Sequence, residues 1–288
     1  MGLILSHINI NVVGNIITFV ELFNEPFLQR ALIGGFLTGS LGGLVGSFAV
    51  LRQLSFFSDA LGHSALLGIT LGILLNVNPT LVLIPFAVIF ALLVNNLVER
   101  SSLPTDALLN IVYSSSLAAA ILALSRVNSY RGSIRQLLFG DILGITRSDI
   151  FIVSFLFLLS FFYLIFSLRS QVLLTLNQDL AGSIGITTQY HKLAFIILLG
   201  VVVSVSIKSV GVLLISAFVV IPACAGRLIS RKFSTYIIFS MLLGGTCALF
   251  GLVLSGLLNL PSGPSIVILQ FIAFLLSLGI SKSIKSAK

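Results

Sequence analysis

Asp59 and His63 are the two residues of this sequence whose types and spacing are best suited to binding a ligand. They stand four residues apart in an apolar run that continues to Leu75. At helical spacing both side chains share one face of a helix. A carboxylate beside an imidazole is costly inside a membrane-spanning segment unless the pair binds something. This pair is therefore the strongest pointer to function in the chain.

The donor atoms of this pair suit a divalent metal ion. A carboxylate with an imidazole favours Mn²⁺, Fe²⁺ or Zn²⁺ over copper(I), which prefers sulfur. One chain offers only two ligands, whereas two chains meeting at a two-fold axis would offer two Asp and two His. The alternative is that Ser58 and Asp59 cap the helix near the membrane interface while His63 packs in the core. The residues alone leave both interpretations open.

The composition places these residues in a membrane protein. Charged residues make up 8% of the 288 residues and hydrophobic residues 57%, against about 25% charged in soluble domains. We expect an all-α, polytopic bundle of nine or ten helices within a single domain, residues 1–288. Segment 8–23 is the weaker tenth candidate, because it is diluted by polar residues and could lie at the interface. The predicted spans are residues 28–51, 57–76, 79–98, 104–125, 148–168, 192–207, 209–226, 233–257 and 265–281.

The basic residues account for the net charge of +8 and indicate an orientation. They gather at span ends rather than on one soluble face, so no nucleic-acid partner is expected. The tail 282–288, the loop at 227–232 and the ends of the connector 169–191 are basic, which places them in the cytoplasm. The exception is the segment 126–147, which should face outward although it contains four arginines. Either the predicted order of inside and outside loops is wrong by one span, or Arg126, Arg131 and Arg135 dock an acidic external partner protein.

The connector 169–191 is the one substantial polar loop predicted inside. Asn177 is suited to cap a short helix over Asp179, Leu180 and Ala181, which Gly182 or Gly185 would end. Such an amphipathic segment at the membrane surface is a suitable binding surface for a soluble partner protein. The alternative is a plain connector between two helices.

Five segments together resemble the membrane subunits of ABC importers for manganese, zinc and iron. The resemblance runs from Pro26 to about Pro264. The segments that carry it are Pro26-Phe27-Leu28-Gln29-Arg30-Ala31-Leu32, Phe57-Ser58-Asp59-Ala60-Leu61-Gly62-His63-Ser64, Leu138-Phe139-Gly140-Asp141-Ile142-Leu143, Asp179-Leu180-Ala181-Gly182-Ser183-Ile184-Gly185-Ile186 and Val210-Gly211-Val212-Leu213-Leu214-Ile215-Ser216-Ala217-Phe218-Val219-Val220-Ile221-Pro222-Ala223. One departure is Gly62, where relatives commonly have serine.

The resemblance implies a type II importer permease fold, like that of the vitamin B12 importer, in a homodimer. It implies an ATPase subunit that docks on the Asp179 segment, and an extracytoplasmic binding protein that delivers the metal. It also places the segment from Leu138 to Leu143 at the outer side, in agreement with the predicted order of inside and outside loops. Asp59 and His63 would then contact the transported ion, with manganese favoured and zinc or iron open. No permanently bound cofactor is expected.

Two glycine-containing helices are expected to shape the bundle. Gly35, Gly39 and Gly43 repeat every four residues, a spacing that allows close approach between helix backbones, so this helix should lie centrally. Gly211 and Pro222 interrupt the apolar stretch that contains Ser216. We assign that helix to the translocation path, although a simple packing kink is equally compatible with a proline.

Rival functions fit less well. The chain has no Gly-x-x-x-x-Gly-Lys-Ser/Thr loop, so it is not expected to be an enzyme and ATP would be hydrolysed by a separate subunit. A membrane hydrolase would need an HExxH-like pair, which the sequence lacks. A stand-alone ion-coupled carrier would usually show repeated halves, and a permease for B12 or a siderophore would not need inner-sphere ligands. Cys224 and Cys247 lie inside spans and predict no disulfide. A bacterial plasma membrane and a plastid membrane both remain open.

Overall fold

The computed structural model describes residues 25–125, 138, 140–176 and 187–286. Within these residues it contains ten α-helices and no strands. Eight of the helices are long and apolar enough to cross a membrane. They are α2 (Pro26–Leu51), α3 (Ser55–Leu74), α4 (Pro79–Arg100), α5 (Thr105–Leu124), α7 (Arg147–Phe166), α10 (Thr188–Val210), α12 (Phe233–Leu258) and α13 (Ser262–Ser286). The predicted all-α membrane bundle is therefore confirmed.

The two remaining helices depart from the predicted spans. α11 (Ile215–Ile229) has 15 residues, which is about 22 Å of helix and shorter than the hydrocarbon core of a bilayer. It begins later than the predicted span at 209 because Gly211 ends α10 with φ of 91°. α8 (Leu168–Leu176) was not predicted; it continues the polypeptide directly beyond α7. The weak candidate 8–23 lies outside the described residues.

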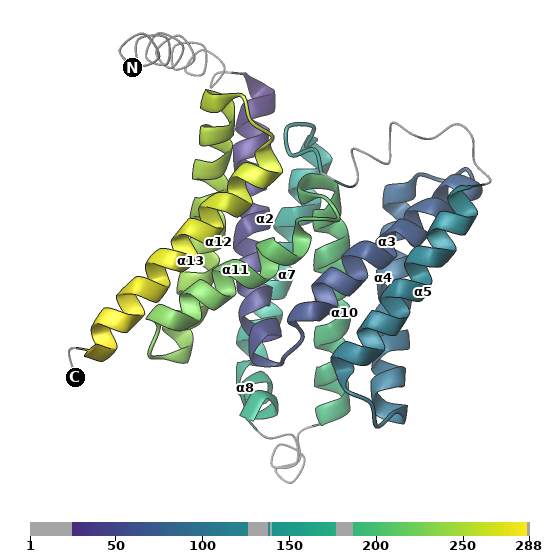
Figure 1. Ribbon diagram of the computed structural model, residues 1–288, viewed down its shortest axis with the longest axis horizontal. Coiled ribbons are helices and arrows are strands. Elements are labelled where there is room, and N and C mark those ends of the chain that lie inside the picture. The colour runs from purple at the N-terminus through teal and green to yellow at the C-terminus, as the bar shows by residue number, and fades with distance from the viewer. Residues whose placement is uncertain (1–24, 126–137, 139, 177–186, 287–288) are drawn as a thin grey trace, which may run out of the picture.

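Successive long helices alternate in direction, so the turns fall at two ends of the bundle (Figure 1). One end carries most of the basic residues, and the bias toward basic cytoplasmic loops identifies it as the inner end. Arg147 and Lys208 lie at the opposite end. The segment 126–147 was predicted to face outward, in agreement with this position of Arg147. The described basic residues at the inner end include Arg52, Arg100, Arg169, Lys192, Arg227, Arg231, Lys232 and Lys282.

The central helix is α2, as the glycine pattern predicted, and it packs on α12, α11 and α7. A methyl group on Gly39 would overlap the backbone of Gly244 in α12. On the neighbouring face, a methyl group on Gly42 would lie 2.7 Å from the carbonyl oxygen of Phe218 in α11. Because these contacts are between backbones, larger side chains here would push the helices apart.

Candidate metal centre

α3 carries the predicted metal ligands and is held among α4, α5, α10 and α11. Most of its first four turns are buried, including Phe57, Ser58 and Leu61. The partly open positions of its middle turns are Asp59, His63, Leu66 and Leu67, which recur every three or four residues along one face. Asp59 and His63 therefore share the one open stripe of a buried helix, with side chains 33% and 21% exposed.

The imidazole of His63 is oriented by its own helix. Nδ1 lies 3.0 Å from the carbonyl oxygen of Asp59 and 3.7 Å from the carboxylate oxygen Oδ1. A carbonyl oxygen only accepts hydrogen bonds, so Nδ1 is the donor in this contact, and Nε2 is not engaged by it. Metal-binding histidines commonly donate one ring N–H to a carbonyl or carboxylate in this way. The geometry leaves Nε2 available as a ligand.

The capping interpretation of Asp59 fails. α3 begins at Ser55, its N-cap is Leu54, and its first turn contains no acidic residue. Asp59 is thus one turn inside the helix, where its carboxylate satisfies no helix-end N–H group. His63 is also only partly buried rather than a core residue.

The ring of Tyr113, from α5, packs edge-on against His63 with 5.0 Å between ring centroids. This contact was not predicted from the sequence, since Tyr113 lies 50 residues away in an ordinary apolar span. Within the described residues, no group of three or more His, Cys, Asp or Glu side chains is close enough to hold a metal ion. In the described part of the chain, Asp59 and His63 therefore have no third such side chain close enough to complete a metal site.

The break between α10 and α11, residues 211–214, lies against α3. A methyl group on Gly62 would stand 3.1 Å from both the carbonyl oxygen of Val212 and Cγ2 of Ile215. Glycine at this position therefore lets the break approach the ligand helix closely, and Ser216 follows as the second residue of α11.

Pro222 lies inside α11 and cannot donate a hydrogen bond to the carbonyl of Phe218. That carbonyl faces the backbone of α2 at Gly42. The location of this freed carbonyl favours the packing explanation for the proline. The assignment of Gly211, Ser216 and Pro222 to the translocation path stays a prediction.

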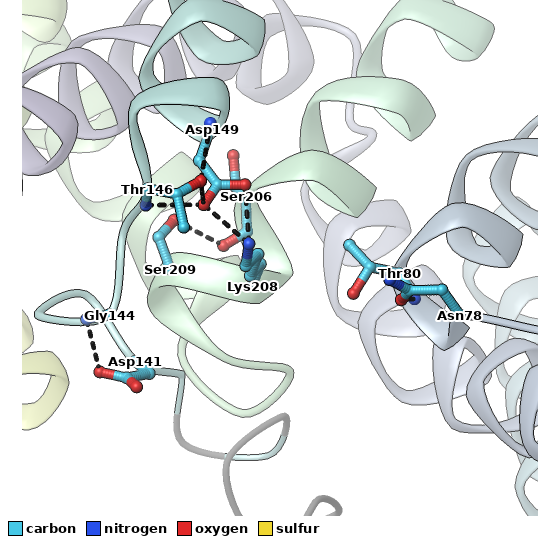
Figure 2. Close-up of polar contacts among 9 residues, drawn as sticks. All are labelled: Asn78, Thr80, Asp141, Gly144, Thr146, Asp149, Ser206, Lys208 and Ser209. Carbon is cyan, nitrogen blue, oxygen red and sulfur yellow. Dashed lines mark hydrogen bonds and ion pairs between the residues drawn. The ribbon is translucent and has the colours of Figure 1, made fainter.

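The outer end of the bundle holds a saturated polar cluster (Figure 2). The ammonium group of Lys208 donates to both carboxylate oxygens of Asp149, at 2.8 and 2.7 Å. Asp149 also accepts from the backbone N–H and the hydroxyl of Thr146, while the Thr146 hydroxyl accepts from the Asp149 N–H, which completes a capping box at the start of α7. These contacts join the beginning of α7 to the end of α10.

The segment between α5 and α7 is also bound to the end of α10. The Asp141 N–H donates to the carbonyl of Lys208, and the Leu213 N–H donates to the carbonyl of Leu138. Gly140 adopts a φ of 73°, and a side chain there would overlap the backbone at Val210. Glycine is thus required both by conformation and by close approach.

A second polar cluster lies at the inner end. Arg52 donates to the side chain of Gln171 in α8 and stacks on Phe195 in α10, 4.6 Å from the ring centroid. Gln171 in turn donates to the Tyr163 hydroxyl at 2.9 Å. Burial lowers the pKa of Arg52 to about 10, so the guanidinium remains charged at neutral pH. The cluster ties the α2–α3 turn to the helix that leads into the predicted coupling segment.

Two sets of predicted residues lie outside the described part of the chain. They are Arg126, Arg131 and Arg135, predicted to dock a binding protein, and Asn177, Asp179, Leu180, Ala181 and Gly185, predicted to couple to the ATPase. The flanking residues Leu138 and Leu176 are described. Both cysteines are free, as predicted.

The chain is similar to known transport proteins over most of its length. Residues 24–281 match the family model of the ABC 3 transport family. The chain is 30% identical over 251 residues to the high-affinity zinc uptake system membrane protein ZnuB of Haemophilus influenzae, covering 87% of this chain and 96% of that protein. It is 30% identical over 262 residues to the manganese import system permease protein ScaB of Streptococcus gordonii, covering 89% and 92%.

A solved structure shares the architecture. PsaBC from Streptococcus pneumoniae, determined in complex with a Fab, matches with a TM-score of 0.80 and 28% identity. The match covers 91% of this chain and 95% of that one. The likeness extends over nearly the whole bundle, so the arrangement of helices around α3 belongs to a known architecture.

Proposed function

Because this chain belongs to the ABC 3 transport family, we propose that it is the membrane permease of an ATP-driven importer for a divalent metal ion, with manganese as the favoured cargo. It is a multi-pass integral membrane protein, and its described residues include eight helices suited to crossing the bilayer. Two relatives are named for zinc and manganese transport. An ABC permease works with an ATPase and a substrate-delivering protein, which are the partners expected here.

The observation that carries the metal assignment is the orientation of His63. Its Nδ1 is engaged by the Asp59 carbonyl, so Nε2 and the Asp59 carboxylate are left for a ligand on the open stripe of α3. Buried ionisable groups in membrane spans usually pair with one another or bind a substrate. The 3.7 Å separation of Nδ1 and Oδ1 is too long for a hydrogen bond between the two side chains.

Two ligands hold a metal ion weakly, so we propose that a second copy of the chain completes the site. A two-fold axis beside α3 would bring together two carboxylates and two imidazoles. A transport site must release its ion, and a site assembled between two subunits can open when they move apart. Manganese is favoured because a carboxylate with imidazole and no thiolate suits a harder ion, although zinc is served nearly as well.

Uptake by the complete transporter tests this proposal. The permease, its ATPase and its binding protein would be reconstituted in vesicles and supplied with ⁵⁴Mn²⁺, with Zn²⁺ or Fe²⁺ as competitors. Asp59→Ala or His63→Ala should abolish uptake while the complex still assembles and hydrolyses ATP. Undiminished uptake by both variants would reject the site. Stronger competition by Zn²⁺ than by unlabelled Mn²⁺ would reject manganese as the preferred cargo.

A further inference from the structure

α5 exposes a row of polar side chains that the metal site does not account for. Asp106, Asn110 and Ser114 are exposed and recur every four residues, so they form a stripe along one face of the helix. The Ser114 hydroxyl donates to Oδ1 of Asn110 at 3.3 Å. Apart from the single Ser115, the other exposed residues of α5 are apolar, such as Ile111 and Leu122, which suit contact with lipid.

A polar stripe of this kind is unfavourable against lipid. Asn110 and Ser114 lie in the second and third turns of a 20-residue span, and a polar side chain facing hydrocarbon without partners costs free energy. Polar residues in membrane helices accordingly face the protein interior or a water-filled path. Among the residues that the structure describes, nothing covers this stripe, so we expect a second component to face it.

The stripe is continuous with the metal centre. Tyr113 stands one residue before Ser114 and three after Asn110, and its ring contacts His63. α3 and α5 pack side by side, and both rise from the inner end of the bundle (Figure 1). From Tyr113 to Asp106 the helix descends seven residues, about 10 Å, toward the inner end. The three polar side chains therefore lead from the level of His63 to the cytoplasmic surface.

We infer that Asp106, Asn110 and Ser114 form the inner half of the metal path, lined by this stripe from each of two copies of the chain. This inference rests on the proposed metal-transport function and assigns the route of release. The hydroxyl, amide and carboxylate oxygens are acceptable ligands for Mn²⁺ and related ions. Neutral oxygens in the middle bind an ion weakly enough to let it move on, and the carboxylate at the mouth attracts cations.

A second copy of the chain accounts both for the uncovered polar stripe of α5 and for the incomplete metal site on α3. The same two-fold axis that would complete the Asp59 and His63 site passes beside α3, and α5 is its neighbour on that side through Tyr113. Duplicating the stripe across the axis provides polar surface opposite polar surface. Lipid and an unrelated membrane protein are the other occupants, and the experiment below separates them.

The test compares Asn110 with Ser115, an exposed serine on another face of the same helix. In the reconstituted complex, Asn110→Leu should lower the Mn²⁺ uptake rate about tenfold, as expected for losing one ligand at a barrier. Ser115→Leu should leave the rate unchanged. Asp106→Asn should lower uptake less, because the Asp106 carboxylate lies at the mouth of the path, near water.

Accessibility provides a readout independent of transport. In a background with Cys224→Ser and Cys247→Ala, Asn110→Cys should react with a charged, membrane-impermeant thiol reagent, be protected by Mn²⁺, and form a disulfide between two copies. Ser115→Cys should do none of these. If Asn110→Cys behaves like Ser115→Cys and Asn110→Leu transports normally, the stripe faces lipid or another protein and the inference is wrong. Loss of uptake in Asp59→Ala alongside that result would leave the proposed function intact.

Discussion

Two acid–base pairs lie on or between the apolar helices of this protein, and their contacts differ. At the outer end, both carboxylate oxygens of Asp149 accept from Lys208, and Thr146 adds two further donors. In the second and third turns of α3, the Asp59 and His63 side chains lie 3.7 Å apart, and the imidazole donates instead to a backbone carbonyl. In the first pair both carboxylate oxygens are already hydrogen-bonded, whereas the second pair has atoms left to bind a ligand.

The difference separates a structural role from a ligand-binding one. The Asp149 pair uses its hydrogen-bonding capacity to join α7 to α10. The Asp59 pair lies on the open stripe of a helix that is otherwise buried, so its remaining capacity is directed at whatever faces that stripe. Charge and depth alone would not distinguish these pairs, because both consist of an acid and a base on or between apolar helices.

Isosteric neutralisation of each acid should give the largest contrast. Asp59→Asn removes a charged ligand and should abolish Mn²⁺ uptake with little effect on unfolding in detergent. Asp149→Asn should retain uptake, because no proposed ligand is changed. Uptake and thermal unfolding measured on both variants check this. Equal loss of uptake in the two variants would contradict the division of roles.

The inner cluster extends the comparison to a third group. Gln171→Leu leaves the buried guanidinium of Arg52 without its side-chain acceptor, which should cost about 2 kcal/mol of stability. Because α8 precedes the predicted coupling segment, this variant should also hydrolyse more ATP per ion transported. The ratio of ATP hydrolysed to Mn²⁺ taken up provides the measurement. Leu174→Ala, in the same helix, is the matched control and should leave the ratio unchanged.

The outer ion pair should contribute a smaller amount. Its side chains are 37% and 20% exposed, so a double-mutant cycle with Asp149→Ala and Lys208→Ala should give a coupling energy of about 1 kcal/mol. High salt should reduce that coupling, since partly exposed charges are screened. A coupling that is absent at low salt would show that the pair does not hold α7 to α10.

Gly62 should give the smallest effect when it is replaced by alanine. The added methyl group would be tight against Val212 and Ile215, but alanine improves helix propensity by about 1 kcal/mol, so the two contributions nearly cancel. Gly62→Val cannot be accommodated without moving the α10–α11 break and should slow uptake clearly. Unfolding and uptake of both variants decide this, and normal uptake by Gly62→Val would show that close approach at this point is not needed.

Much of the bundle could be predicted, because long apolar segments have few alternatives in lipid. The nine main spans and the central position of α2 follow from charge-free stretches and glycine spacing. The exceptions have identifiable causes. α8 was not predicted because its polar and apolar residues show no clear period, and α11 starts late because Gly211 adopts a conformation that ends α10.

The arrangement of the proposed metal ligands could be predicted in part for a similar reason. Spacing places Asp59 and His63 on one face of any helix, and local geometry then orients the imidazole within the same turn. Tyr113 and the stripe of Asp106, Asn110 and Ser114 were missed, since serine and asparagine in an apolar span carry no signal until their exposure is known. A search for polar residues at four-residue spacing in that span would have found them.

The sequence by itself determined the membrane class, most of the helix spans and the four-residue spacing of Asp59 and His63, because hydropathy and helical period act locally. The orientation that it predicts from charge placement stays a prediction. Only the tertiary structure decided which faces are covered. Packing buries most of α3 yet leaves Asp59 and His63 open, satisfies Asp149 completely, and exposes the polar stripe of α5. Those outcomes depend on contacts between segments far apart in the chain. A residue's role there is set by whether its neighbours hydrogen-bond to it or leave it open.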